Sequence, residues 1–385
     1  MKRDSLLLIS TSYPDAADGS EAAGAFVADL AHVLASRLPV RVVGPGRVPS
    51  AGQPGATPAV WRFAAGDRPL SLLSPKVPTD WPRLAAVLRS MRRQVQAAVA
   101  DGRVAHILAL WALPSGWIAH DVGRRTHIPY SIWALGSDIW TLGKVPGVAC
   151  LLRRVAADAD GCFADGLQLA ADAERICGRA FGFLPSTRRT LLPGIAPLRP
   201  SAPWRLLFLG RWHPNKGVDL LLQALQQLPE EAWSAIDRVT IAGGGPLEQQ
   251  VQAGVAALQA DRRPVRLSGF LSAQEAAEAM SETDWLVIPS RIESIPVVLS
   301  DALKSGRPVV VTAVGDMGEL VNGPRACGIV AEVPTAESIA AAIAKAVVLG
   351  PAPFLDGVLE VAARFDLERI ADRVQAATVV PNDKG

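Results

Sequence analysis

The sequence has few cysteines and no long apolar run. Its 385 residues include four cysteines, none of them spaced as CxxC and none with a histidine at metal-ligand spacing. Four such thiols indicate reduced, mostly buried residues of a cytoplasmic protein, rather than a disulfide framework or a zinc site. No uninterrupted apolar run reaches about 18 residues, so we expect no membrane-spanning helix. The opening MKRDSLLLIS fits a buried first strand better than a signal peptide, because its apolar run is short and follows Asp4.

Charge is distributed unevenly along the chain. The net charge is only +2, but residues 1–200 hold 23 Lys and Arg against 15 Asp and Glu, whereas the remainder holds 16 against 22. A basic first half suggests contact with an anionic lipid surface or a phosphate-bearing acceptor, although simple solvation of both halves explains the counts equally well. Nucleic acid is disfavoured, because the basic residues do not alternate with aromatic residues along one element.

Short apolar segments alternate with helical segments along most of the chain. Examples are LLLIS at 6–10, VRVVG at 40–44, AHILAL at 105–110 and YSIWAL at 130–135, with helical patterns at 22–36 and 115–125. Strands without polar alternation are typical of a parallel sheet that is covered on both faces. Residues 44–80 are rich in Pro, Gly and Ser, and predict loops with one edge strand at AVWRFAA.

A proline-rich segment at 193–204, PGIAPLRPSAPW, is the best candidate for a linker. After it the alternation restarts, with strands at 205–210, 238–245, 265–269, 285–290 and 308–312. The fold class is therefore α/β, with two doubly wound domains in series. We predict domains at 1–198 and 199–365 and a last helix within 366–385, which packs back toward the first domain.

Ligands of open parallel sheets bind at the carboxyl ends of the strands. The first strand is followed by TSYPDAADGSEAAGAFVADL, in which Gly24 opens a helix and allows close approach of an anion to its N–H groups. An ordinary strand-to-helix loop is the alternative. There is no GxGxxG here, which weakens a dinucleotide interpretation and disfavours a nicotinamide oxidoreductase.

Tryptophans cluster after two neighbouring strands of the first half. Trp111 lies in ALWALPSGW, and Trp133, Asp138 and Trp140 lie in YSIWALGSDIW. Together they are suited to an apolar sugar-binding platform with polar groups at its edge. The alternative is a set of core tryptophans with Asp138 as a helix cap.

The second half has two charged loops of this kind. In FLGRWHPNKGVDLL, Arg211 and Lys216 lie between a buried strand and a helix, and Gly210 and Gly217 are possible hinges. An arginine fork and a lysine point charge are suited to a diphosphate. Solvated loop cations are the alternative.

The other charged loop is SRIESIPVVLSDALK, where Glu293 precedes a helix that starts at Pro296 and Asp301 lies inside that helix. Each carboxylate can accept hydrogen bonds from a pair of vicinal hydroxyls, one pair on a sugar and the other on a ribose. The alternative is a Glu that the helix dipole favours and a surface Asp.

These segments together resemble the retaining nucleotide-sugar glycosyltransferases of glycosyltransferase family 4, which have the GT-B fold of two Rossmann-like domains facing each other across a cleft. The resemblance covers nearly the whole chain and is densest from 205 to 332. It rests on FLGRWHPNKGVDLLLQAL, IAGGGPLEQQV, VRLSGFLSAQEAAEAMSETDWLVIPS, ESIPVVLSDALKSGRPVVVTAVGDMGELV and CGIVAEV, and in the first half on IPYSIWALGSDIW.

The resemblance implies a role for each matching residue. Glu293 is the acid that holds the donor sugar, and Asp301 takes the place of the acid that binds the ribose. Arg211 and Lys216 hold the diphosphate and stabilise the leaving group. The remaining implied donor contacts are the backbone at Gly24, Gly210, Phe270, Leu271, Ser294, Ile295, Pro296 and Val297.

Two positions depart from the family pattern. Asp301 replaces a glutamate and is shorter by one methylene, so its ribose contact requires closer approach or a bridging water. Leu108, Leu110 and Leu135 stand where the family has histidines, which leaves Asp138 as the polar catalytic candidate of the first half.

The activity implied is transfer of a sugar with retention at the anomeric carbon, from a nucleotide-diphosphate sugar to a glycan, lipid-linked or small-molecule acceptor. The resemblance implies no metal and no cofactor. The cysteine content predicts a cytoplasmic location, and the basic first half suggests peripheral contact with the inner face of the membrane. The alternatives are a degenerate nucleotide-sugar-binding protein and a GT-B UDP-sugar epimerase.

Overall fold

The computed structural model describes residues 3–14, 24–53, 55–65, 77–145, 147–189 and 197–378. The chain divides into two compact units: unit 1 is Met1–Pro185 with Leu367–Gly385, and unit 2 is Ser186–Asp366. The division falls before the boundary predicted at 198/199, because residues just after Pro185 contact a helix of unit 2. Thr187 Oγ1, for example, accepts a hydrogen bond from Lys304 Nζ at 2.8 Å.

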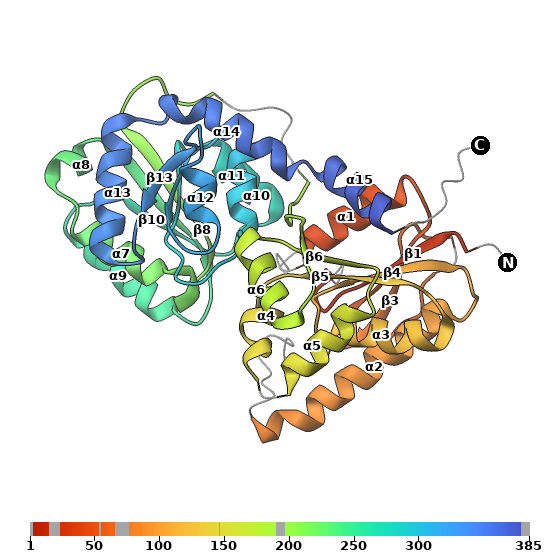
Figure 1. Cartoon of the computed structure of the whole chain (residues 1–385). Helices are drawn as coiled ribbons and strands as arrows, with labels where there is room; N and C mark the ends of the chain where they lie inside the picture. Colours follow the sequence, from red (N-terminus) through yellow and green to blue (C-terminus); the bar gives the residue numbers. More distant parts are fainter. Residues whose placement is uncertain are drawn as a thin grey trace. The chain divides into compact units, whose positions relative to one another are not determined.

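Unit 1 is built on a seven-stranded parallel sheet of order β3-β2-β1-β4-β5-β6-β7 (Figure 1). Its strands are β1 (Ser5–Ile9), β2 (Val40–Gly46), β3 (Ala59–Ala64), β4 (Val104–Leu110), β5 (Tyr130–Ala134), β6 (Gly161–Ala164) and β7 (Gly182–Phe183). Its α-helices are α1 (Ala25–Ala35), α2 (Trp81–Val99), α3 (Ser115–Thr126), α4 (Ser137–Trp140), α5 (Val148–Ala157), α6 (Leu167–Cys177) and α15 (Leu367–Ala377).

Both faces of this sheet are covered, which explains the continuous apolar runs of its strands. Leu6 and Leu8 of β1 point into one core with residues of α1 and α15. Leu7 and Ile9 point into the opposite core with residues of α2, α3, α5 and α6. Because successive side chains of a strand point to opposite faces, a buried strand needs apolar residues at every position.

The C-terminal helix α15 packs on α1 within unit 1. Its apolar residues Ile370, Ala371 and Val374 are buried in the same core as α1. At the rim, Arg37 forms ion pairs with Glu368 and with Asp372, the latter at 2.6 Å. Burial of the apolar face of α15 therefore joins the end of the chain to its first helix.

Unit 2 is built on a six-stranded parallel sheet of order β10-β9-β8-β11-β12-β13. Its strands are β8 (Trp204–Arg211), β9 (Ile236–Gly244), β10 (Val265–Ser268), β11 (Trp285–Ile288), β12 (Val309–Thr312) and β13 (Gly328–Ala331). Its helices are η4 (Pro214–Lys216), α7 (Val218–Gln226), α8 (Glu230–Ser234), α9 (Glu248–Ala260), α10 (Ala273–Ser281), α11 (Val297–Lys304), α12 (Met317–Val321), α13 (Ala336–Leu349), the 3-10 turns η5 (Ala352–Phe354) and η6 (Ala363–Phe365), and α14 (Leu355–Ala362). Helices α7, α9 and α13 lie on one side of the sheet, and α10, α11 and α12 on the other (Figure 1).

The strand order of unit 2 reverses direction between β8 and β11. Connections from β8 lead outward through β9 to β10, whereas β11 leads through β12 to β13. In open α/β sheets, the crevice at such a switch point, outside the carboxyl ends of the strands, is where ligands bind. We therefore expect a ligand site at the loops that leave β8 and β11.

No single helix among the described residues is long and apolar enough to cross a membrane. The length and apolar composition of a membrane-spanning segment are reached only when two helical segments are joined across a bend, Ala336–Leu349 and Ala352–Ala377. Most of the apolar residues of α13, the first of these segments, are buried in the core of unit 2.

Candidate functional site

The loops after β8 and β11 bring two of the predicted catalytic residues together. Lys216, the last residue of η4, forms an ion pair with Glu293 through its Nζ and the Oε2 of the carboxylate. Both side chains are partly exposed, so the pair can be reached from solvent. Residues that lie 77 positions apart in the sequence thus form a charged pair at the switch point of the sheet.

A second, bidentate ion pair fixes these two loops to each other. Arg291 donates to the two carboxylate oxygens of Asp219 at 2.8 and 2.7 Å, and also to the carbonyl of Pro214 at 2.6 Å. The backbone N–H of Arg291 donates to the carbonyl of Asn215 at 2.8 Å. Because Asp219 follows Lys216 closely and Arg291 precedes Glu293 closely, this clamp holds the Lys216–Glu293 pair in register.

Glycine is required at position 217, where η4 turns into α7. Gly217 is in the left-handed region with φ 69°, and a Cβ there would lie 1.8 Å from the carbonyl oxygen of Pro289. The chain therefore passes directly over the end of β11, which brings Lys216 within reach of the β11 loop.

The helix α11 begins just after Glu293 and presents its N-terminus at the same loop. Pro296 is the N-cap, with extended backbone, and no side chain caps the helix. Ser294 and Ile295 are buried, and Val297 is the first helical residue. The first N–H groups of a helix have no partner within the helix, and its dipole favours negative charge there.

Positive charge dominates the β8 side of the site. Arg211 ends β8 with an exposed side chain, one residue after Gly210. Burial, together with the charges of Arg211 and Lys216, lowers the pKa of His213 in the same loop. The ring Nδ1 of His213 accepts the N–H of Asn215 at 3.2 Å, which shapes the turn that carries Lys216.

Phe270 and Leu271 lie in the loop after β10. The Phe270 side chain is 70% exposed, although one ring edge lies against the backbone of Gly244, where a Cβ would come within 2.4 Å. One edge of the Phe270 ring thus packs on Gly244 at the end of β9, and its exposed face is suited to stack against a planar group.

Asp301 lies on α11 between two cations. Its carboxylate oxygens are 3.9 Å from Arg188 Nη1 and 3.8 Å from Lys304 Nζ. Lys304 also donates to the carbonyl of Arg188. The segment after Pro185 therefore lies along α11 and contributes a cation beside the predicted ribose-binding acid.

Asp138 of unit 1 has a different environment from Glu293. It is fully buried, and its oxygens accept backbone N–H groups of Ala112 at 2.6 Å and of Leu135 and Ile139 at 3.2 Å each. Burial raises the pKa of Asp138 to about 6, and these hydrogen bonds limit the rise. Asp138 is therefore not the N-cap of α4, which is Gly136; its carboxylate instead joins the loop after β4, at Ala112, to the loop after β5, at Leu135.

The other predicted residue of unit 1, Gly24, is the N-cap of α1. It has φ 92°, and a Cβ would lie 2.6 Å from the backbone of Ser12 in the loop after β1. Only glycine fits this close approach. Residues 15–23 of the same predicted loop lie outside the described residues.

Within the described ranges, no group of three or more His, Cys, Asp or Glu side chains is placed to hold a metal ion. Cys162, Cys177 and Cys327 are buried free thiols, and Cys150 is an exposed one.

Comparison with known proteins finds a family similarity in the part of the chain that holds the charged site. Residues 203–347 match the model of the family described as glycosyl transferases group 1. Over these residues the chain is therefore similar to the group 1 glycosyl transferases. The match includes Arg211, Lys216, Glu293 and Asp301, the residues that the resemblance places around the donor.

Curated relatives align over about a third of the chain. An uncharacterized glycosyltransferase of Methanocaldococcus jannaschii is 30% identical over 115 residues, 30% of this chain and 30% of the relative. The D-inositol 3-phosphate glycosyltransferase of Xylanimonas cellulosilytica is 32% identical over 139 residues, 35% of this chain and 32% of the relative. The chain thus matches about a third of the length of these relatives.

Solved structures align over almost the whole chain and confirm the predicted fold class. Sucrose-phosphate synthase of Thermosynechococcus elongatus has a TM-score of 0.76 at 21% identity, covering 97% of this chain and 98% of that chain. Anabaena Alr3699/HepE in complex with UDP-glucose has a TM-score of 0.69 at 16% identity, covering 97% and 98%. The two parallel-sheet, Rossmann-like units are those of the GT-B fold.

Proposed function

We propose that this chain is a glycosyltransferase that transfers a sugar from a nucleotide-diphosphate sugar to an acceptor, with retention at the anomeric carbon and without a metal ion. The observation that carries the proposal is the Lys216–Glu293 pair beside Arg211 and the N-terminus of α11. A diphosphate and a sugar ring together need this combination: cations for the phosphates, and a carboxylate and N–H groups for the hydroxyls.

The charges have complementary tasks in the reaction. Arg211 and Lys216 neutralise the negative charge that develops on the departing diphosphate, and the N–H groups of α11 add a fixed positive potential. Lys216 has three donors, so it can keep Glu293 oriented while another N–H contacts a phosphate oxygen. Glu293 acts as an acceptor for sugar hydroxyls and does not need to change its protonation state.

Three further residues contact the nucleoside in this proposal. Asp301 accepts hydrogen bonds from the ribose hydroxyls, with Arg188 and Lys304 holding its carboxylate. Phe270 and Leu271 lie beside the base. The related structures support such a donor, because Anabaena Alr3699/HepE is described in complex with UDP and with UDP-glucose.

The acceptor belongs to unit 1 in this proposal. Trp111 after β4 and Trp140 after β5 form its binding surface, and the excess of basic residues in the first half favours a lipid-linked or phosphorylated acceptor at the inner face of a membrane. Asp138 supports this surface through the backbone of Ala112 and Leu135.

A donor-turnover assay tests the proposal. UDP-, GDP- and ADP-sugars are incubated with the full chain and with candidate glycan or lipid acceptors, and release of the nucleoside diphosphate is measured. Glu293→Ala and Arg211→Ala should each lower turnover about 100-fold or more, the effect typical of removing one transition-state contact. Glu278→Ala, which removes an exposed carboxylate of α10, is the matched control and should leave turnover unchanged.

Unchanged turnover in both site variants would overturn the proposal. Binding of a nucleotide sugar without any turnover would instead favour the binding-protein alternative. Release of UDP from a UDP-sugar without an acceptor would favour an epimerase.

A further inference from the structure

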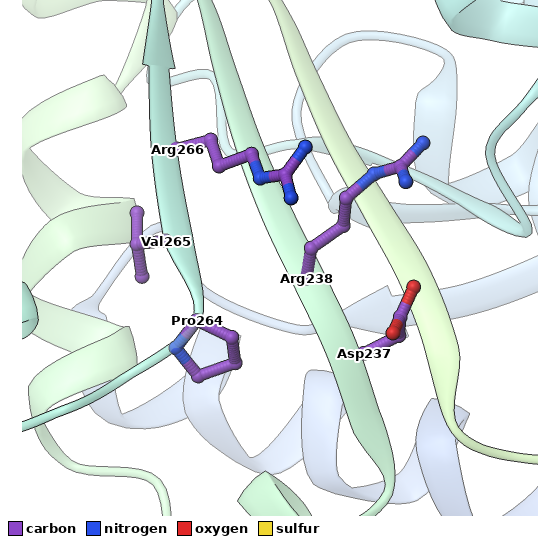
Figure 2. Close-up of a pocket in the computed structure, with 5 residues that line it drawn as sticks. All are labelled: Asp237, Arg238, Pro264, Val265 and Arg266. Carbon is purple, nitrogen blue, oxygen red and sulfur yellow. The ribbon is translucent and has the colours of Figure 1, made fainter.

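A row of arginines crosses one face of the unit 2 sheet. Arg205 of β8 and Arg238 of β9 are directly opposite in the register. Arg266 of β10 is opposite Thr240, two residues after Arg238 and on the same face of the sheet. Figure 2 shows the side chains of Arg238 and Arg266 extending the same way from neighbouring strands.

Two adjoining hollows lie along this row. One has a volume of about 370 Å³ and is lined by Asp237, Arg238, Pro264, Val265 and Arg266 (Figure 2). The other, of about 340 Å³, shares Arg238 and Arg266. Its lining adds Arg205 and the hydroxyl-bearing residues Thr240, Ser268 and Thr283. Both volumes fall at the lower end of the range of roughly 300–1,000 Å³ that small-molecule sites occupy.

The arginines are not fully neutralised by their neighbours. Arg205 pairs with the buried Asp284 at 3.1 Å, and Arg238 pairs with Glu282 at 2.9 Å. Among the described residues, no carboxylate lies within ion-pair distance of Arg266, which is exposed. Like charges side by side on a sheet destabilise it, so an unpaired arginine beside two others is a place where an anion would be favourable.

The row is separate from the candidate donor site. Arg205 and Arg238 are the second and third residues of β8 and β9, near the amino ends of these strands. Lys216 and Glu293 follow the carboxyl ends of β8 and β11. The two groups of cations therefore lie at opposite ends of the same sheet.

We propose that the two hollows form a second site, which binds a small phosphomonoester. Arg266 and Arg238 donate their planar forks to the phosphate oxygens, and the hydroxyls of Thr240 and Ser268 are placed to add hydrogen bonds. The Glu282 side chain is 64% exposed, so it can leave Arg238 for solvent when the anion binds. This site does not depend on the proposed glycosyltransferase activity.

Calorimetric titration of the full chain with inorganic phosphate, in chloride buffer, tests the site. Wild-type protein should bind, and Arg266→Gln and Arg238→Gln should each weaken the Kd about tenfold or more, as expected for loss of a charged hydrogen bond. Arg364→Gln removes an exposed arginine elsewhere in unit 2 and should leave the Kd unchanged. Arg211→Ala should retain this binding, whatever it does to turnover of a sugar donor.

Absence of phosphate binding by the wild type would overturn the site. So would binding that both glutamine variants retain, with circular dichroism showing that they are folded. The wild type could instead bind anionic phospholipid vesicles but no phosphate. If Arg266→Gln then loses the vesicle binding, the arginines belong to a membrane-binding surface and not to a phosphate site.

Discussion

Two predicted catalytic carboxylates of this chain have opposite environments. Asp138 of unit 1 is fully buried and accepts three backbone N–H groups. Glu293 of unit 2 is partly exposed and pairs with the flexible side chain of Lys216. Both follow a strand of a parallel sheet, so position in the fold does not distinguish them. The partners do: backbone donors fix Asp138 into the structure, whereas a lysine partner leaves Glu293 accessible to a ligand.

The two carboxylates should differ most in how much their removal lowers the free energy of unfolding. Asp138→Ala leaves the N–H groups of Ala112 and Leu135 without this acceptor, whereas Ile139 keeps the carbonyl of Gly136, and we expect the variant to lower the free energy of unfolding by about 2 kcal/mol. Glu293→Ala removes a partly exposed pair and should change it by about 0.5 kcal/mol or less. Urea unfolding followed by circular dichroism measures both. A small loss in Asp138→Ala, comparable to that of Glu293→Ala, would contradict a structural role for Asp138.

Arg291 should affect the unit 2 site without touching the ligand. We expect Arg291→Ala to raise the KM for a turned-over nucleotide sugar about tenfold, because the clamp to Asp219 and Pro214 no longer positions Lys216 against Glu293. Arg291→Lys should recover only part of this effect, since lysine cannot make the bidentate contact.

The matched control for Arg291 is Arg263→Ala, which removes a surface pair with Glu230 on a different part of unit 2. Its KM should equal that of the wild type. An equal rise of KM in both variants would show that the clamp has no specific positioning role.

The smallest expected effect is a pH dependence that comes from Asp138. Its pKa is raised to about 6 in the folded protein from a usual value of 3.8. Between these values the folded state holds a proton that the unfolded state has lost, so the stability contributed by this group falls as the pH rises from about 4 to about 6. Asp138→Asn should lack this part of the pH dependence in denaturant titrations at several pH values. An identical pH profile in the variant would show that Asp138 titrates normally.

Much of the fold could be predicted from the sequence, because parallel strands that are buried on both faces leave continuous apolar runs. The run predicted at 130–135 is β5 (Tyr130–Ala134), and the helix predicted at 115–125 is α3 (Ser115–Thr126). Short strands such as β7 have too few residues to show a pattern. The residues after Pro185 were assigned to the first domain, since their contacts with Lys304 depend on tertiary structure.

The site could be predicted only in part, for a similar reason. Arg211, Lys216 and Glu293 stand out because charged residues follow apolar runs. The Arg291–Asp219 clamp joins residues 72 positions apart, and no local spacing indicates it. The arginine row needs the register of three strands, which single-sequence patterns do not give. Conversely, the burial of Asp138 follows from the packing of α4, not from its position after a strand.

Binding of nucleotide-diphosphate sugars tests the central claim most directly. Calorimetric titration of UDP-, GDP- and ADP-glucose into the wild type, Arg211→Ala and Lys216→Ala measures the affinity of the unit 2 site. We predict that at least one donor binds the wild type and that each variant weakens its Kd about tenfold or more. Equal affinity in the wild type and both folded variants, or no binding of any donor, would contradict the account.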